Sequence, residues 1–174
     1  MPGPDGWCGV VDTNILIGAY IKDYTPTVFP GVWRFLDHQV QAGRLVLIDA
    51  VRREVLHPDG LVGWVQDHAN LIVRETEDLD TVERYEQVIG WVKDSGRYTR
   101  RAADDFARGA DGWLVSLGRV KGMAVVTNEA FNAESRKHVP IPNVCREFDV
   151  ECVTATAMFE RLGARFLWDR ADVN

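Results

Sequence analysis

The stretch Cys8-Gly-Val-Val-Asp-Thr-Asn-Ile-Leu-Ile17 decides the fold. Its short apolar run, rich in β-branched residues, is typical of a buried strand, and the run stops at Asp12. The aliphatic residues that follow predict a helix, so the Asp12 side chain should emerge where the strand turns into the next element. Taken alone, Asp12 or Thr13 could serve only as the cap of that helix.

Outward from this stretch, short apolar runs alternate with amphipathic patterns. The further strand candidates are residues 45–48, 71–73, 124–127 and 151–154. Apolar residues at helical spacing predict helices within 28–40, 79–92, 110–117 and 155–166. Such alternation is typical of parallel βαβ units with both faces of the sheet covered. We therefore expect a single domain over residues 1–174 with an α/β fold: three α/β/α layers around a central, mostly parallel sheet of four or five short strands.

Composition and charge limit the class of protein. The chain has 174 residues, 46% of them hydrophobic, with no apolar stretch long enough to span a membrane and no signal-peptide pattern at its start. Three cysteines without metal-ligand spacing agree with a reducing compartment, so we expect a cytoplasmic protein without membrane partners. The net charge of −6 counts against nucleic acid, but the basic groups within 97–108 and 136–138 allow locally positive surface. Each group, taken alone, is equally well explained as a solvated face or loop.

Three more acids fall beside predicted strand ends or helix starts. Glu54 lies in a short helical segment after Asp49, Asp111 lies in the first turn of the helix over 110–117, and Glu129 follows the strand end at Thr127. Each also has an ordinary explanation as a surface charge or as an acid favoured by a helix dipole. Their combination with Asp12 is the informative feature, because ligands bind beyond the carboxyl ends of parallel strands.

Several carboxylates in one crevice repel one another unless they are protonated or neutralised. A hard divalent cation such as Mg²⁺ or Mn²⁺ provides that neutralisation through oxygen ligands. Such a site suits phosphodiester hydrolysis without a protein nucleophile. The chain also lacks the nucleophile elbow, the phosphate-binding loop and the zinc-protease motif, and its four histidines are scattered and predicted to be structural.

Three blocks of the sequence, in order, carry a resemblance to a known family. Val10-Val-Asp-Thr-Asn-Ile-Leu-Ile17, Ala110-Asp-Gly-Trp-Leu-Val-Ser-Leu117 and Gly122-Met-Ala-Val-Val-Thr-Asn-Glu129 resemble the corresponding blocks of PIN-domain ribonucleases. The resemblance runs from about Val10 to Leu162. The segments 29–33 and 141–152 are similar to one uncharacterised prokaryotic PIN-like subfamily, itself similar to VapC-type toxins.

The resemblance implies a catalytic set and a cofactor. It makes Asp12, Glu54, Asp111 and Glu129 the acidic set, with Asp12, Asp111 and Glu129 as ligands of Mg²⁺ or Mn²⁺ and Thr13, Asn14 and Thr127 as polar supports. Glu54 is placed by position rather than by a tight motif, and Glu129 replaces the Asp more usual there. Asp104 and Asp105 compete for the third place, and Asp104 would share a helix face with Asp111 if Gly109 did not stand between them. The family pattern places the acid at the start of the helix and so selects Asp111, with Asp105 as the reserve.

Three functional hypotheses follow. The first is a metal-dependent ribonuclease acting on RNA, in the manner of a toxin held by a cognate antitoxin, with exposed aromatic residues of the 28–40 helix as an antitoxin or homodimer surface if they are not core. The second is a catalytically silent PIN-like module that binds RNA or protein. The third, a phosphatase of the haloacid dehalogenase type, requires a second acid where this chain has Asn14.

Overall fold

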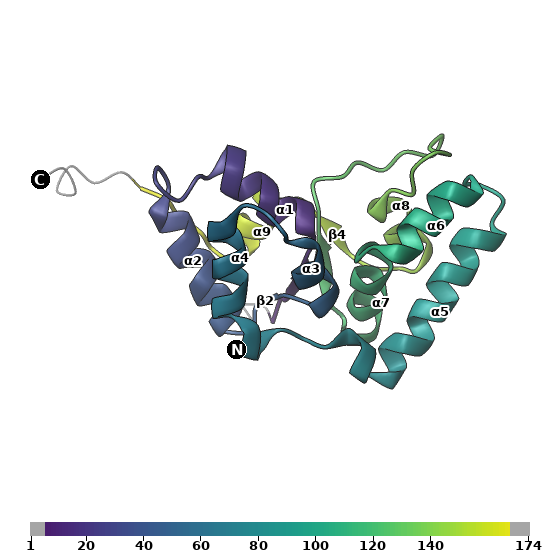
Figure 1. Cartoon of the computed structure of the whole chain (residues 1–174), viewed down its shortest axis with the longest axis horizontal. Coiled ribbons are helices and arrows are strands. Elements are labelled where there is room, and N and C mark those ends of the chain that lie inside the picture. The colour runs from purple at the N-terminus through teal and green to yellow at the C-terminus, as the bar shows by residue number, and fades with distance from the viewer. Residues whose placement is uncertain (1–5, 168–174) are drawn as a thin grey trace, which may run out of the picture.

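A four-stranded, fully parallel sheet forms the centre of the protein, for which a computed structural model describes residues 6–167 (Figure 1). The strands are β1 Gly9–Val11, β2 Leu45–Val46, β3 Ala124–Val126 and β4 Cys152–Val153. Their spatial order is β2-β1-β3-β4, with Val10 of β1 opposite Val46 on one side and Val125 on the other. All residues of β1 and β3 are buried, as expected for strands covered on both faces.

The fifth predicted strand is reduced to one bridge. Val73 pairs with Ile48, its amide donates to Leu47 (2.9 Å), and its carbonyl accepts from the amide of Asp49 (3.0 Å). The preceding residues form a 3₁₀ turn, Ala69–Leu71, so no longer strand can develop there. Within residues 6–167 the sheet therefore has four strands, the lower of the two numbers that the sequence predicts.

Helices cover both faces of the sheet. They are α1 Thr13–Gly18, α2 Pro30–Gln41, α3 Asp49–Glu54, α4 Asp59–Asp67, α5 Leu79–Asp94, α6 Arg100–Arg108, α7 Asp111–Lys121, α8 Ile141–Glu147 and α9 Ala155–Arg161. A π-helical turn, η1 Ala19–Asp23, follows α1, and a 3₁₀ turn, η3 Glu75–Glu77, precedes α5. In Figure 1, α2, α4 and α9 lie on one side and α5, α6, α7 and α8 on the other. The three-layer α/β/α prediction is confirmed.

The last helix is shorter than the sequence predicts. The apolar spacing extends to Phe166, but α9 ends at Arg161 because Gly163 takes a left-handed φ of 70°. Phe166 then packs as part of an extended segment, with its ring 5.7 Å from that of Phe35 and 5.5 Å from that of Phe159. Helical spacing and tertiary packing produce the same apolar pattern here, so the predicted helix end is wrong.

The aromatic residues of α2 and its start divide between core and surface. Trp33 is 6% exposed and packs edge-on against Tyr20 (5.1 Å) and Trp64 (5.3 Å). Phe29, at the start of the helix, is 44% exposed. Trp33 is therefore a core residue, and only Phe29 remains as exposed aromatic surface of that segment.

Close packing of α7 on α5 fixes the start of α7. Tyr85 of α5 stacks on Trp113 of α7 with ring centroids 3.7 Å apart. A Cβ at Gly112 would lie 2.9 Å from Cε2 of Tyr85 and 3.0 Å from Cδ1 of Ile89, so only glycine permits this approach. The residue before it is Asp111, whose position is thus determined by helix packing.

Two further expectations concern the state of the cysteines and the presence of membrane-spanning helices. Among residues 6–167, Cys8, Cys145 and Cys152 are all free thiols. No helix in this part of the chain has the length and apolar character needed to cross a membrane.

Candidate active site

The strand order creates a crevice at the carboxyl ends of β1 and β3. From β1 the chain first adds β2 on one side and later adds β3 on the other, so the winding reverses between β1 and β3. Asp12 directly follows β1 and Thr127 directly follows β3. Ligands of open α/β sheets bind at such a switch point.

Asp12 is the most buried of the four predicted site acids, with 1% exposure. Its Oδ2 accepts a hydrogen bond from Oγ1 of Thr127 (2.9 Å) and its Oδ1 accepts from the amide of Asn14 (3.3 Å), which also makes it the cap of α1. Burial raises the pKa of Asp12 to about 6, the charges of Glu129 and Glu54 add to the rise, and the two hydrogen bonds oppose it. The capping role and a role in the site therefore coexist.

Glu54 joins the start of α1 to the start of α7. Its Oε2 accepts from Oγ1 of Thr13 (2.5 Å) and its Oε1 accepts from the amide of Ala110 (2.7 Å). A Cβ at Gly109 would lie 3.2 Å from that Oε1, so the glycine leaves room for the carboxylate. Glu54, which was predicted from its position alone, thus links Thr13, the neighbour of Asp12, to Ala110, the neighbour of Asp111.

Asp111 is the first residue of α7 and is partly buried. Burial raises its pKa to about 8, and the charges of Asp12, Glu129 and Glu54 add to the rise. Because each of these acids raises the pKa of Asp111, all four lie close enough to interact through their charges.

The competing acids of α6 differ in their relation to Asp111: Asp105 lines the same hollow as Asp111, whereas Asp104 lines a different one. Helix α6 ends at Arg108 and α7 begins at Asp111, so the two helices are separate, as Gly109 predicts. Asp105 is 58% exposed and forms ion pairs with Arg108 (2.9 Å) and Arg101 (3.8 Å).

Glu129 has a structural role that the sequence did not suggest. No helix begins at this residue, contrary to its reading as a helix-start acid. Its amide donates to Oγ1 of Thr127 (3.2 Å), while its carboxylate accepts from the amide of Ile141 at the start of α8 (2.7 Å) and lies 3.1 Å from Nε2 of His138. Glu129 therefore holds the β3–α8 loop against the site.

The structure brings together most of the predicted set. The acids converge with Thr13 and Thr127, whereas Asn14 contributes its backbone amide and has an exposed side chain. Sequence reasoning missed His138 and Lys137, which line a hollow of about 180 Å³ together with Asp111. Their only signal was a basic group in the loop that follows Glu129.

The carboxylates of the site have the ligand chemistry that a hard divalent cation requires. Carboxylate oxygens are the ligands that Mg²⁺ and Mn²⁺ prefer, and the raised pKa values of Asp12 and Asp111 are those of acids without a countercharge. No three acidic, histidine or cysteine side chains between residues 6 and 167 already stand in a metal-ligating arrangement. Glu54 and Glu129 each point an oxygen at a backbone amide, and a carboxylate oxygen that accepts one hydrogen bond keeps a second lone pair.

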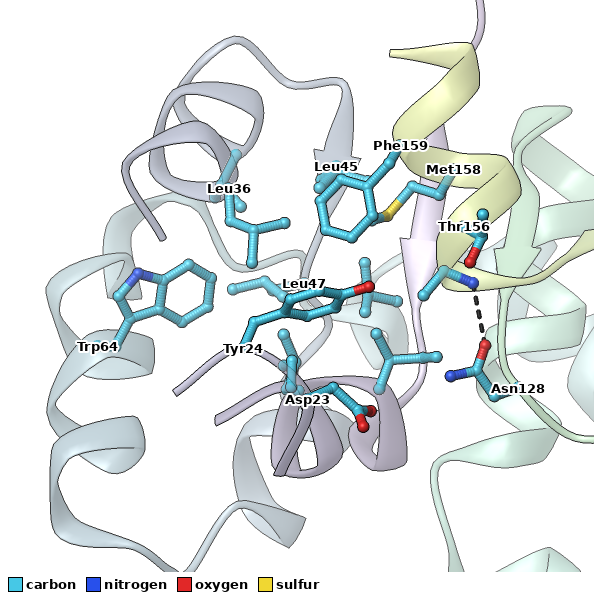
Figure 2. A pocket seen from close by; sticks show the side chains of 16 residues that line it. Asp23, Tyr24, Leu36, Leu45, Leu47, Trp64, Asn128, Thr156, Met158 and Phe159 are labelled. Atoms are coloured by element: carbon cyan, nitrogen blue, oxygen red, sulfur yellow. Dashed lines mark hydrogen bonds between the residues drawn. The ribbon is translucent and has the colours of Figure 1, made fainter. Parts of the chain in front are cut away.

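A second cavity, of about 190 Å³, lies between the sheet and α1, α2 and α9 (Figure 2). Its lining is mostly apolar and includes Leu36, Trp64 and Phe159. Polar groups are few; Asn128 accepts from the amide of Ala155 (3.0 Å), the bond that is dashed in Figure 2. Its lining includes a single carboxylate, that of Asp23, so it offers no paired acids for hydrolysis.

Comparison with known proteins gives one family. The sequence model of a family described as "Domain of unknown function (DUF4411)" matches residues 10–166. No curated protein matches the chain. The matched range includes all four acids and every helix and strand that positions them, apart from the first residue of β1.

Proposed function

The chain belongs to the DUF4411 family, a domain of unknown function, and we propose that it is a PIN-like ribonuclease that depends on Mg²⁺ or Mn²⁺ and hydrolyses phosphodiester bonds of RNA. One observation carries the proposal. Four carboxylates from four separate segments lie near the switch point of the sheet, and burial, with the charges of the neighbouring acids adding to it, raises the pKa of Asp12 to about 6 and that of Asp111 to about 8.

Asp12 and Asp111 would hold the cation, with Glu129 joining through a remaining lone pair or through water. Asp111, with a pKa of about 8, retains its proton near neutral pH when no cation is bound, whereas Asp12, with a pKa of about 6, retains its proton only in more acidic solution; binding must displace these protons, so the affinity should rise with pH. A bound Mg²⁺ or Mn²⁺ supplies water activation and neutralises phosphate charge.

The remaining residues of the set position these two acids. Thr127 donates to Asp12 and thereby favours its ionised, ligating form. Glu54 accepts from Thr13 and from the amide of Ala110, so it fixes the distance between the ends of the two segments that carry Asp12 and Asp111.

The choice of RNA comes from the resemblance of the three sequence blocks to PIN-domain ribonucleases. The same resemblance supports the role of a toxin held inactive by a cognate antitoxin, and a homodimer as a working form. These finer roles depend on the resemblance alone.

The test is cleavage of a labelled single-stranded RNA by the purified chain with Mn²⁺, Mg²⁺ or EDTA. Asp12→Asn and Asp111→Asn should each lower the rate by more than about 100-fold, since even the outer partners of a metal ligand are worth about 10 to 100-fold. Asp149→Asn is the matched control, because this carboxylate is 93% exposed and has a left-handed φ of 53° that Asn tolerates. It also precedes β4, on the side of the amino ends of the parallel strands, whereas the acids follow the carboxyl ends. Circular dichroism would check that each variant folds.

Equal cleavage by wild type and both site variants would refute the mechanism. Binding of RNA that weakens with salt, without any product that depends on a metal, would instead support a silent binding module.

A further inference from the structure

Two basic groups that are distant in the sequence lie side by side next to the acids. One group surrounds the start of α6 and includes Arg97 and Arg100; the other lies in the β3–α8 loop and includes Arg136 and Lys137. The amide of Thr99 donates to the carbonyl of Arg136 (2.8 Å), which joins the two segments directly. The sequence alone left both groups explained as separate solvated surfaces.

The β3–α8 loop is held in place by side chains at both of its ends. Asn143 of α8 accepts from the amide of Asn132 (2.9 Å), and its Nδ2 lies 2.7 Å from the carbonyl of Asn132 and 3.2 Å from the hydroxyl of Tyr98. Glu129 accepts from the amide of Ile141. The basic side chains of the loop therefore have a fixed base, which reduces the entropy lost when a ligand orders them.

The positive side chains follow a path that reaches the acids. Lys137 and His138 line the hollow that contains Asp111 on one side of α6. On another side of α6, a hollow of about 430 Å³ is lined by Lys93 and Arg100 together with the ring of Tyr98. Cationic groups thus lie on both sides of a single helix, together with one carboxylate in each hollow (Asp105 in the first, Asp104 in the second) and an aromatic ring in the second.

These cations are available for an external ligand. Across residues 6–167, none of the following takes part in an ion pair: Lys93, Arg97, Arg100, Arg136 and Lys137. Arg97 lies over the ring of Trp91, 6.0 Å from its centroid. By contrast, Arg101 and Arg108 on the same helix are paired with Asp105.

We propose that the basic strip, defined as Lys93, Arg97, Arg100, Arg136 and Lys137, binds the phosphate backbone of single-stranded RNA and guides it across α6 to Asp111. The inference rests on the proposed function and adds the docking path. A single strand fits better than a duplex, because Tyr98 offers a ring beside Lys93 and Arg100 on which an unpaired base can stack. The net charge of −6 then restricts nucleic acid to this face.

Binding can be measured apart from cleavage by fluorescence anisotropy of a labelled oligouridine in EDTA. Arg100→Gln and Lys137→Gln should each weaken binding about fivefold at roughly 0.1 M salt and reduce the slope of log affinity against log salt by about 0.7, the effect of one lost phosphate contact on a single strand. Arg34→Gln is the control, because Arg34 is exposed and lacks an ion pair in the described range, and because its helix, α2, lies at the opposite end of the molecule from α6 (Figure 1).

The outcomes separate the two proposals. Loss of binding in the strip variants alone, with or without cleavage by the wild type, supports the strip. Affinities equal to that of the wild type would overturn it, even if the enzyme cleaves RNA. Tighter binding of duplex RNA, or of polyglutamate as a mimic of an acidic protein, would also overturn it.

Discussion

Replacing Asp111 with Asn should stabilise the protein above about pH 6. Burial, with the charges of Asp12, Glu129 and Glu54, raises the pKa of Asp111 from 3.8 to about 8. Between these values the folded chain holds a proton that the unfolded chain has released. The free energy of unfolding of the wild type therefore falls as the pH rises from about 4 to about 8, and levels off above that range.

The size of the effect follows from the shift. One pKa unit corresponds to about 1.4 kcal/mol, so a rise of about four units gives an upper limit of about 5 to 6 kcal/mol at pH 8. Water that enters a partly buried site screens part of this penalty, and we expect about 2 to 4 kcal/mol. Asparagine keeps the shape of the side chain but carries no charge, and its presence also removes one of the charges that act on Asp12.

Urea denaturation at several pH values from 5 to 8, in EDTA, measures this difference directly. The free energy of unfolding of Asp111→Asn should exceed that of the wild type by an amount that grows with pH, while the exposed control Asp149→Asn should follow the wild type. Adding Mn²⁺ at pH 8 should stabilise the wild type more than Asp111→Asn, because a ligand of the folded state stabilises it. Parallel pH curves for wild type and Asp111→Asn would refute the raised pKa of Asp111.

Two further predictions concern the framework of the site. Gly112→Ala should lower the free energy of unfolding by about 1 to 3 kcal/mol, because the new Cβ would lie 2.9 Å from Cε2 of Tyr85. Gly90→Ala in α5, where a Cβ would meet open space, should instead raise it by about 0.5 to 1 kcal/mol. Equal effects of the two substitutions in urea or thermal unfolding would contradict the packing argument. Thr127→Val should raise the pKa of Asp12, because it removes the hydrogen bond from Thr127 that lowers this pKa. The rate of Mn²⁺-dependent RNA cleavage should then reach its maximum at a higher pH. An unchanged pH–rate profile would argue against a role of the Thr127–Asp12 hydrogen bond.

The layers and the edge of the sheet that carries the acids were predictable from local pattern. Asp12 ends a buried run and Asp111 begins an amphipathic one, so periodicity alone places both near element ends. Their meeting depends on the parallel order of β1 and β3, which alternation of strands and helices also predicts.

Local pattern failed where long-range contacts decided the outcome. The apolar spacing through Phe166 continues past the end of α9, because Phe35 and Phe159 provide a partner for an extended segment as readily as for a helix. The strand candidate at Val73 had to compete with a 3₁₀ turn, which leaves one residue to pair with Ile48. In both cases the residue type was right and the backbone conformation was wrong.

The orientations of the two glutamates mark the limit of prediction from sequence. Glu54 accepts from an amide 56 residues away and Glu129 from one 12 residues away, and no periodic pattern specifies either bond. An acid at a strand end can be a ligand, a cap or both, and the choice depends on which lone pairs its backbone partners leave free. Asp12 accepts one backbone amide, as each glutamate does, whereas Asp111 accepts none within residues 6–167, and the raised pKa values are those of the two aspartates. The two aspartates should therefore bind the cation most tightly, with the glutamates shaping the site around them.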